Sequence, residues 1–397
     1  MLRPSIGGLL AIAAISLPPL VSSASAVAAS PRTMSQIERQ LAELKAQDTV
    51  AGDSFGTGVS ISGTTLVIGA PGHAKNEGRA YVFTKTATGW AQVAKLKGSD
   101  TVANDFFGTS VAISGTTALV GAYGHANGAG RAYVFTKTAG AWKQVAELKG
   151  ADIAANDFFG LPVAISGFTA VVGAYGCAKY AGRAYVFTKT AGAWKQVAEL
   201  KGSDTVANDF FGDSVAISGT TAVVGASGHA KFAGRAYVFT KTAGVWKQVA
   251  ELKGSDTVVN DSFGDSVAIS GTTVVVGADG YAEYAGKAYV FAETAGVWKQ
   301  IAELEGSDTV AGDFLGISTA VSGDMVVVGE NGIGKDAGTA YLLTETEGAW
   351  RQTAKLKGSD TVGGDSFGFS VAISGTTAVV GAAGHANKAG RTYVFKV

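Results

Sequence analysis

Short runs of alternating apolar and polar residues, separated by glycine-containing turns, recur along the chain with a fixed period of 52 residues. Each period contains four such runs, which in the second period span residues 107–114, 117–122, 131–137 and 142–149. The first three runs are rich in β-branched and aromatic residues and predict strands, and the fourth alternates less cleanly. The connections at 114–116 and 138–140 are short enough for hairpins. No helical periodicity runs through the period, so the pattern predicts four antiparallel strands.

Two kinds of aromatic position mark the period. A Phe-Gly pair stands at the same position of six periods, and Leu315-Gly316 replaces it in the sixth period. The phenylalanines are Phe55, Phe107, Phe159, Phe211, Phe263 and Phe367. A tryptophan begins the fourth run at Trp90, Trp142, Trp194, Trp246, Trp298 and Trp350. Four antiparallel strands repeated at such a period are a β-propeller blade. The alternative, an open β-solenoid, would need capping units at both ends.

The two ends of the repeat indicate that the ring is closed. The last period stops at residues 393–397, in its third strand, so the seventh blade lacks an outer strand. Residues 39–45 match residues 143–149, an outer strand two periods away, and residues 34–397 span seven periods. The sequence therefore predicts an all-β, closed seven-bladed propeller with four antiparallel strands per blade. Its N-terminal strand completes the last blade and protects an edge that would otherwise be open to pairing.

The first 30 residues differ from the repeats. Arg3, an apolar run over 6–21 and small residues at 24–28 are typical of a signal peptide cleaved at about residues 26–30. The apolar run contains two glycines and two prolines and is too short for a membrane span, and no later run is long enough. We therefore expect a signal peptide over residues 1–30, a propeller over residues 31–397 and no transmembrane segment. The expected location is secreted, whether extracellular, periplasmic or associated with a cell surface.

The balance of charge and the single cysteine argue against a nucleic-acid-binding protein and against a disulfide-stabilised one. The chain has 32 basic and 32 acidic residues, whereas a nucleic-acid binder normally carries a positive excess that neutralises phosphate. Cys177 is the only cysteine, so no disulfide forms within the chain and stability rests on packing. No histidine–aspartate pattern accompanies it, and we interpret it as an inert thiol. We expect a monomer with no nucleic-acid partner and no cofactor.

The period resembles the FG-GAP repeats of integrin α-chains and of many bacterial extracellular proteins. The full signature stands in the first period as Phe55-Gly56 followed by Gly69-Ala70-Pro71, and later periods keep the Phe-Gly and most of the Gly-Ala pairs. The resemblance covers residues 34–397 and implies a seven-bladed propeller used for extracellular adhesion or ligand binding. The family often binds calcium in Asp-x-Asp-x-Asp-Gly loops between the first two strands of a blade. Here those connections are Ser-Gly-Thr, as at residues 62–64, which offer too few oxygens for calcium.

The periods differ from one another in the long connections predicted for one face of the ring. These connections enter the first strand and link the second strand to the third, and loops held by a rigid scaffold commonly bind ligands. Aromatic and acidic residues gather there on the third to sixth blades, at Tyr175, Tyr180, Asp213, Phe232, Asp265, Asp279, Tyr281, Glu283 and Tyr284. Such a surface suits a sugar or a basic peptide. The sequence predicts a non-catalytic binding or adhesion protein that recognises an extracellular protein or carbohydrate through this face.

Other interpretations of the same positions stay open. The variable residues are also compatible with solvated loops of a structural scaffold that has no specific ligand. A hydrolase or lyase would use Asp213 and Asp265 as a carboxylate pair at the channel mouth. Nothing else in the sequence converges on that pair, so we expect no catalytic residues.

Two further columns of polar residues have structural interpretations. An aspartate stands two residues before each Phe-Gly or Leu-Gly pair, and we expect it to accept backbone hydrogen bonds in the turn that enters the first strand. A weak cation site formed with Asp100 and Asn104 is the alternative. The four histidines share one position of the period, at His73, His125, His229 and His385. Equivalent residues on neighbouring blades lie on the order of 10 Å apart or more, too far to share a zinc ion, so we expect local hydrogen bonds and no metal site.

Overall fold

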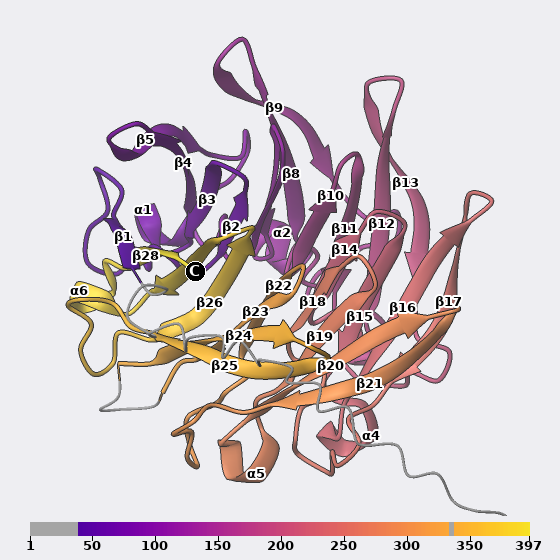
Figure 1. Ribbon diagram of the computed structural model, residues 1–397. Coiled ribbons are helices and arrows are strands. Elements are labelled where there is room, and N and C mark those ends of the chain that lie inside the picture. Colours follow the sequence, from indigo (N-terminus) through magenta and orange to yellow (C-terminus); the bar gives the residue numbers. More distant parts are fainter. Residues whose placement is uncertain (1–38, 333–336) are drawn as a thin grey trace, which may run out of the picture. The chain divides into compact units, whose positions relative to one another are not determined.

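Seven four-stranded antiparallel sheets follow one another as blades around a ring (Figure 1). The computed structural model describes residues 39–332 and 337–397. This architecture confirms the predicted fold class. The predicted signal peptide, residues 1–30, lies outside the described residues. No helical segment within residues 39–332 and 337–397 is long and apolar enough to cross a membrane.

The four strand positions of a blade repeat closely from one blade to the next. The first strands are β2 (Val59–Ser62), β6 (Val111–Ser114), β10 (Val163–Ser166), β14 (Val215–Ser218), β18 (Val267–Ser270), β22 (Ser318–Ser322) and β26 (Phe367–Ser374). The second strands are β3 (Thr65–Ala70), β7 (Thr117–Ala122), β11 (Thr169–Ala174), β15 (Thr221–Ala226), β19 (Thr273–Ala278), β23 (Met325–Glu330) and β27 (Thr377–Ala382). The third strands are β4 (Arg79–Thr86), β8 (Arg131–Thr138), β12 (Arg183–Thr190), β16 (Arg235–Thr242), β20 (Lys287–Thr294), β24 (Thr339–Thr346) and β28 (Arg391–Lys396). The outer strands are β5 (Gly89–Leu96), β9 (Ala141–Leu148), β13 (Ala193–Leu200), β17 (Val245–Leu252), β21 (Val297–Leu304), β25 (Ala349–Leu356) and β1 (Arg39–Leu44).

The N-terminal strand completes the seventh blade, as predicted. In Figure 1 the indigo β1 lies beside the yellow β28, and the two pair antiparallel from Arg39 opposite Lys396 to Leu44 opposite Thr392. An ion pair between Arg391 Nε and Glu43 Oε1, 2.8 Å apart, supports the same contact. The outer edge of β28 is therefore paired by a segment about 350 residues away in sequence.

In six of the seven blades the first strand is shorter than its apolar run predicts, whereas β26 of the seventh blade begins at Phe367 as predicted. The run at 107–114 forms a strand only from Val111, and Phe106 and Gly108 before it have φ angles of 55° and 97°. Phe107 instead forms a parallel bridge with Gly78 of the preceding blade. The contact is so close that a Cβ on Gly78 would lie 2.0 Å from the Phe107 carbonyl oxygen. The Phe-Gly pair thus packs directly against the backbone of the preceding blade.

A left-handed turn links the second and third strands in six of the seven blades, among the described residues. These turns are α1 (His73–Asn76), α2 (His125–Gly128), α3 (Cys177–Tyr180), α4 (His229–Phe232), α5 (Tyr281–Tyr284) and α6 (His385–Lys388). In α1, Ala74, Lys75 and Asn76 have φ angles between 53° and 63°. The carbonyls of Lys75 and Asn76 accept hydrogen bonds of 3.2 Å and 2.8 Å from the backbone of the next blade, at Asn104 and Phe106. Each turn is therefore fastened to the loop that enters the next blade.

Candidate binding site at the channel mouth

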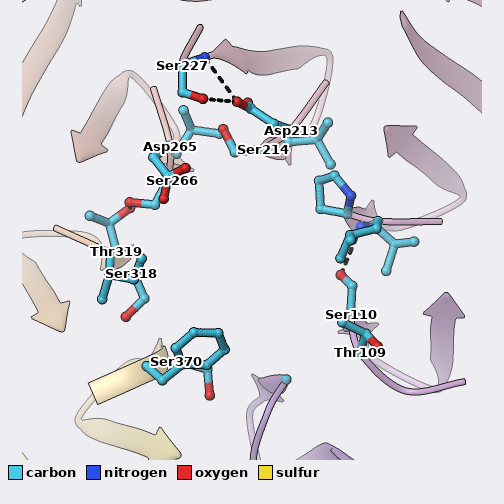
Figure 2. Close-up of a pocket in the computed structure, with 18 of the residues that line it drawn as sticks. Thr109, Ser110, Asp213, Ser214, Ser227, Asp265, Ser266, Ser318, Thr319 and Ser370 are labelled. Carbon is cyan, nitrogen blue, oxygen red and sulfur yellow. Dashed lines mark hydrogen bonds between the residues drawn. The ribbon is translucent and has the colours of Figure 1, made fainter. Parts of the chain in front are cut away.

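The first strands of all seven blades line a central channel, and the channel opens into a cavity of about 580 Å³. The cavity lies where the first strands begin, on the face that carries the long connections. Figure 2 shows the Ser, Thr and Asp side chains that surround it. A second cavity of about 230 Å³ is lined by the following residues of the same strands, such as Val59, Ser60 and Ile61. The first strands therefore line the axis, as the sequence interpretation assumed.

Four of the nine predicted site residues line the larger cavity: Tyr175, Asp213, Phe232 and Asp265. They come from two kinds of connection, those that enter the first strand and those that follow the second. Their neighbours on the other blades are of a different chemical type, because the position of Asp213 is held by Thr57, Thr109, Ile317 and Phe369 elsewhere in the ring. The cavity lining is therefore asymmetric, although the blades that carry it are alike.

Only one of the two carboxylate oxygens of Asp213 accepts hydrogen bonds within the described residues. Its Oδ2 accepts hydrogen bonds from the backbone N–H of Ser227, at 3.0 Å, and from the Ser227 hydroxyl (Figure 2). Its Oδ1 is buried and has no hydrogen-bond partner within residues 39–332 and 337–397. The residue is mostly buried and lines the cavity, and burial raises the pKa of Asp213 to about 7. A carboxyl with this environment is partly protonated at neutral pH.

Asp265 and Asp279 are the equivalents of Asp213 and Ser227 one blade further on. In the fourth blade Ser227 donates its hydroxyl proton to Asp213, whereas in the fifth blade Asp279 stands at the position of Ser227 and offers a second carboxylate instead of a donor. Burial raises the pKa of Asp265 well above its usual range, and the nearby carboxylates of Asp279 and Asp213 raise it further. Burial also raises the pKa of Asp279 to about 6. Asp279 does not line the cavity, but it lies close enough to Asp265 to couple to it electrostatically.

Six aromatic rings form a continuous arc over the second to fourth blades, and we call them the aromatic arc: Phe106, Tyr123, Phe158, Tyr175, Phe210 and Phe232. Successive ring centroids are 5.1–6.2 Å apart. Tyr175, Phe210 and Phe232 line the cavity. Tyr180 packs on Phe210 at 5.7 Å and extends the apolar surface outward. The arc therefore leads from the rim of the face into the cavity.

Four of the six arc residues, Phe106, Tyr123, Phe158 and Phe210, were not among the predicted site residues. Phe106, Phe158 and Phe210 each directly precede a Phe-Gly pair, and the sequence interpretation considered only the pair. A signal existed, because this position holds only serine or phenylalanine around the ring. The three residues have φ angles of 55–58°, which are unusual for a bulky side chain.

Seven segments of the chain match the FG-GAP repeat family, at residues 39–83, 90–135, 142–187, 194–239, 246–291, 298–343 and 350–395. The chain belongs to the FG-GAP repeat family. Each matched segment begins on an outer strand and ends in the third strand of the next blade, as residues 39–83 do from β1 to β4. Comparison with curated proteins found no match.

The remaining predicted residues lie elsewhere on this FG-GAP propeller. The hydroxyl of Tyr281 donates to Asp256 Oδ2 at 2.9 Å, and Lys287 Nζ lies 4.1 Å from the Tyr281 ring centroid. Lys287 also pairs with Glu303 at 2.9 Å, so Tyr281 belongs to a charged cluster beside the third strand. Tyr284 is exposed and packs on Phe314 at 5.1 Å. Glu283, also in α5, is exposed. The structure therefore does not bring these three residues to the cavity lining.

The aspartate column of the FG-GAP propeller has the predicted structural role. In all seven blades its Oδ2 accepts the backbone N–H of the residue three positions earlier, as Asp105 does from Val102 at 2.9 Å. The histidines pair with the same oxygen, at 2.8 Å for His125 Nδ1 and Asp105. Local hydrogen bonds of the histidines are thus confirmed. No group of three or more His, Cys, Asp and Glu side chains in the described part of the chain is placed to hold a metal ion.

Cys177 takes the position of the histidine in the third blade. It is buried, its Sγ lies 3.7 Å from the hydroxyl of Tyr185, and burial raises the pKa of its thiol to about 12. The reactive form of cysteine is the thiolate, and at neutral pH almost none forms here. The interpretation of Cys177 as an inert thiol agrees with this environment.

Proposed function

We propose that this FG-GAP propeller is a secreted or cell-surface, non-catalytic binding protein that recognises an extracellular carbohydrate or protein at the mouth of its channel. The observation that carries the proposal is the asymmetry of the cavity lining. Both carboxylates and three of the four aromatic rings that line the cavity lie on the third to fifth blades, and equivalent positions of other blades hold residues of different chemistry, such as Thr57, Ile317 and Ala383. A purely structural ring has no need of this departure from the repeat.

The energetics of the lining support binding. Phe232 and Tyr180 are 43% and 38% exposed, although each already packs against a ring of the arc or its neighbour. Exposed aromatic surface beside buried polar groups is typical of binding sites, since a ligand removes the rings from water and supplies partners to the polar atoms. The buried and unpaired Oδ1 of Asp213 is such a polar atom.

The features of residues 1–30 support secretion. A basic start, an apolar run and small residues at the expected cleavage position form the complete pattern of an export signal. Expression of the full chain in a bacterial host, followed by mass determination of the exported protein, tests this. We expect a new N-terminus between residues 26 and 31, and retention of the intact chain in the cytoplasm would contradict it.

A hydrolase or lyase is the second candidate, and one observation favours it. Asp213 and Asp265 line the same cavity, and burial raises the pKa of Asp213 to about 7, which suits a general acid at neutral pH. If the site is catalytic, Asp213→Asn should abolish turnover of a captured ligand while its binding persists. Loss of capture without any turnover by the wild type would favour the binding protein.

A panel of extracellular glycans and surface proteins, tested for capture by the purified chain, examines the proposal directly. The repeat supplies conservative variants, because Tyr175 is equivalent to Ala383 and Phe232 to Gly128 in other blades. We expect the double variant Tyr175→Ala, Phe232→Gly to reduce capture at least about 10-fold, since two buried aromatic contacts are lost. Phe168→Ala is the matched control, because Phe168 is an aromatic residue 64% exposed in a turn on the opposite face.

Two results would contradict the proposal. Capture that survives the double variant would place binding elsewhere on the propeller. Failure of the wild type to capture any member of a broad panel would favour the structural scaffold.

A further inference from the structure

Six hydroxyl groups around the channel mouth already donate their protons to backbone carbonyls of the protein. Four serines donate to backbone carbonyls at 2.6–2.7 Å: Ser214 to Gly264, Ser266 to Gly316, Ser318 to Gly368 and Ser370 to Gly56. Thr57 and Thr109 donate to the carbonyls of Ser54 and Phe106, at 2.7 Å and 2.9 Å. A carbonyl oxygen can only accept, so the direction of these bonds is unambiguous. These six hydroxyls therefore offer a ligand only their oxygen lone pairs.

The carboxylates add further acceptors and negative charge. Asp213 Oδ1 has no partner, and the side chain of Asp265 makes no hydrogen bond within the described residues. No lysine, arginine or histidine lies among the described residues that line the cavity. The described lining of the cavity therefore carries no cationic side chain, and oxygen acceptors dominate it. Anions such as phosphates and uronates are disfavoured, and a ligand with several donors and a positive charge is favoured.

The aromatic arc limits the shape of that ligand. Tyr175, Phe210 and Phe232 line the same cavity as the carboxylates (Figure 2 shows the carboxylates and hydroxyls of the lining). Ring faces attract cations and stack against the apolar C–H faces of sugars. The acceptors surround the mouth on all sides rather than meeting at one point, and the cavity of about 580 Å³ is of the size that holds a small molecule. A single lysine side chain has one donor group and would leave most of these acceptors unpaired.

We propose that the channel mouth binds a saccharide that carries a free amino group, with the ammonium at Asp213 and Asp265 and the sugar hydroxyls donating to the ring of serine and threonine oxygens. This inference rests on the proposed function, because it names the ligand class of the same site. The sugar ring packs on Phe210 and Phe232, and the arc guides the rest of the chain toward the rim. The carbohydrate is thereby favoured over a protein partner.

Binding of an amino sugar is linked to proton release. The titratable groups at the mouth are Asp213, Asp265, Asp279 and Tyr175, and burial raises the pKa of each of them. An ammonium group stabilises the ionised carboxylates, so the carboxyls lose protons when the ligand binds. Affinity should therefore increase from pH 5 to pH 7, while a neutral saccharide should bind more weakly as the carboxyls ionise.

Isothermal titration of the full chain with three probes tests the inference. The probes are a β-1,4-linked glucosamine trisaccharide, its fully N-acetylated counterpart and a trilysine peptide. We expect the glucosamine trisaccharide to bind at least about 10-fold more tightly than the other two at pH 7, since charged hydrogen bonds distinguish them. Asp265→Asn should weaken this binding about 10-fold to 100-fold. Asp265→Thr, which matches Thr57 and Thr109 at equivalent positions, is a second variant, and Asp324→Asn in an exposed turn of the opposite face is the control.

Several results would overturn the inference. Equal affinity for the amino and N-acetylated probes would show that the amine is not recognised, and tighter binding of trilysine would show that the ligand is a basic peptide. Unchanged affinity in both Asp265 variants would place the amine elsewhere. In each of these cases the chain still binds a ligand, and the aromatic double variant decides separately whether the proposed function at the mouth holds. If no probe binds, the inference fails, and capture from the broad panel decides the proposed function separately.

Discussion

Replacement of Asp213 by asparagine removes a buried charge and preserves the shape of the side chain. The asparagine oxygen can still accept the two hydrogen bonds that Ser227 now gives to Oδ2. Burial raises the pKa of Asp213 to about 7, whereas an aspartate in an unfolded chain has a pKa of about 3.9. The folded state therefore binds the proton more tightly. Its stability is greatest below about pH 4, falls as the pH rises from about 4 to 7, and stays low above that range.

The size of the effect follows from the same shift. About three pKa units correspond to roughly 4 kcal/mol, and water in the channel reduces this to about 1–3 kcal/mol. Urea unfolding at pH 8 should therefore show that Asp213→Asn is more stable than the wild type by that amount. At pH 4 most of the difference should vanish, because the wild-type carboxyl is then protonated. Asp324→Asn, in an exposed turn, should show no such pH dependence.

The reasoning is refuted if Asp213→Asn is equally stable or less stable than the wild type at pH 8. That result would mean that the carboxylate has a compensating partner and that the channel mouth stores no unpaired charge. The expected gain in stability has a functional meaning, because residues that destabilise a fold commonly persist where a ligand needs them.

Three further perturbations test the closure of the ring and the structural roles of Asp105 and Cys177. Deletion of β1 should leave the edge of β28 unpaired and cause aggregation in size-exclusion chromatography, and a monomeric variant with unchanged melting temperature would contradict the closure. Asp105→Ala should lower the free energy of unfolding by about 1–3 kcal/mol, because a turn N–H and an imidazole lose their acceptor; an unchanged urea midpoint would mean that these bonds contribute nothing. Cys177 should react with a thiol reagent at pH 8 only after unfolding, and rapid labelling of the native chain would show that its burial is incomplete.

The blade architecture could be predicted because it depends on short-range patterns that repeat. Alternation of apolar and polar residues defines strands locally, and seven copies in register give the number of blades. The closure followed from the match between residues 39–45 and an outer strand. The start of the first strand was predicted wrongly in the second blade, where Phe107 forms a bridge with Gly78 of another blade, a contact between distant residues that local alternation does not show.

The site could be predicted only in part. Sequence comparison of the repeats identified which positions vary, and four of the nine site residues predicted from it line the cavity. It could not distinguish Tyr175, which faces the channel, from Tyr281, which pairs with Asp256 beside the third strand. The two tyrosines occupy positions of the period that differ by only two residues, and the direction of each depends on the left-handed turn that follows the second strand.

The sequence by itself determined the strands, the number of blades and their closure, because hydrophobic alternation and a repeated period act within each blade. Only the tertiary structure decided the chemistry of the channel mouth. The carboxylates, hydroxyls and rings that meet there come from seven blades spread over more than 300 residues, and the hydroxyls of Ser214, Ser266, Ser318 and Ser370 donate to carbonyls of the neighbouring blade. Such directions and partners arise only when the ring closes and brings the seven first strands around one axis.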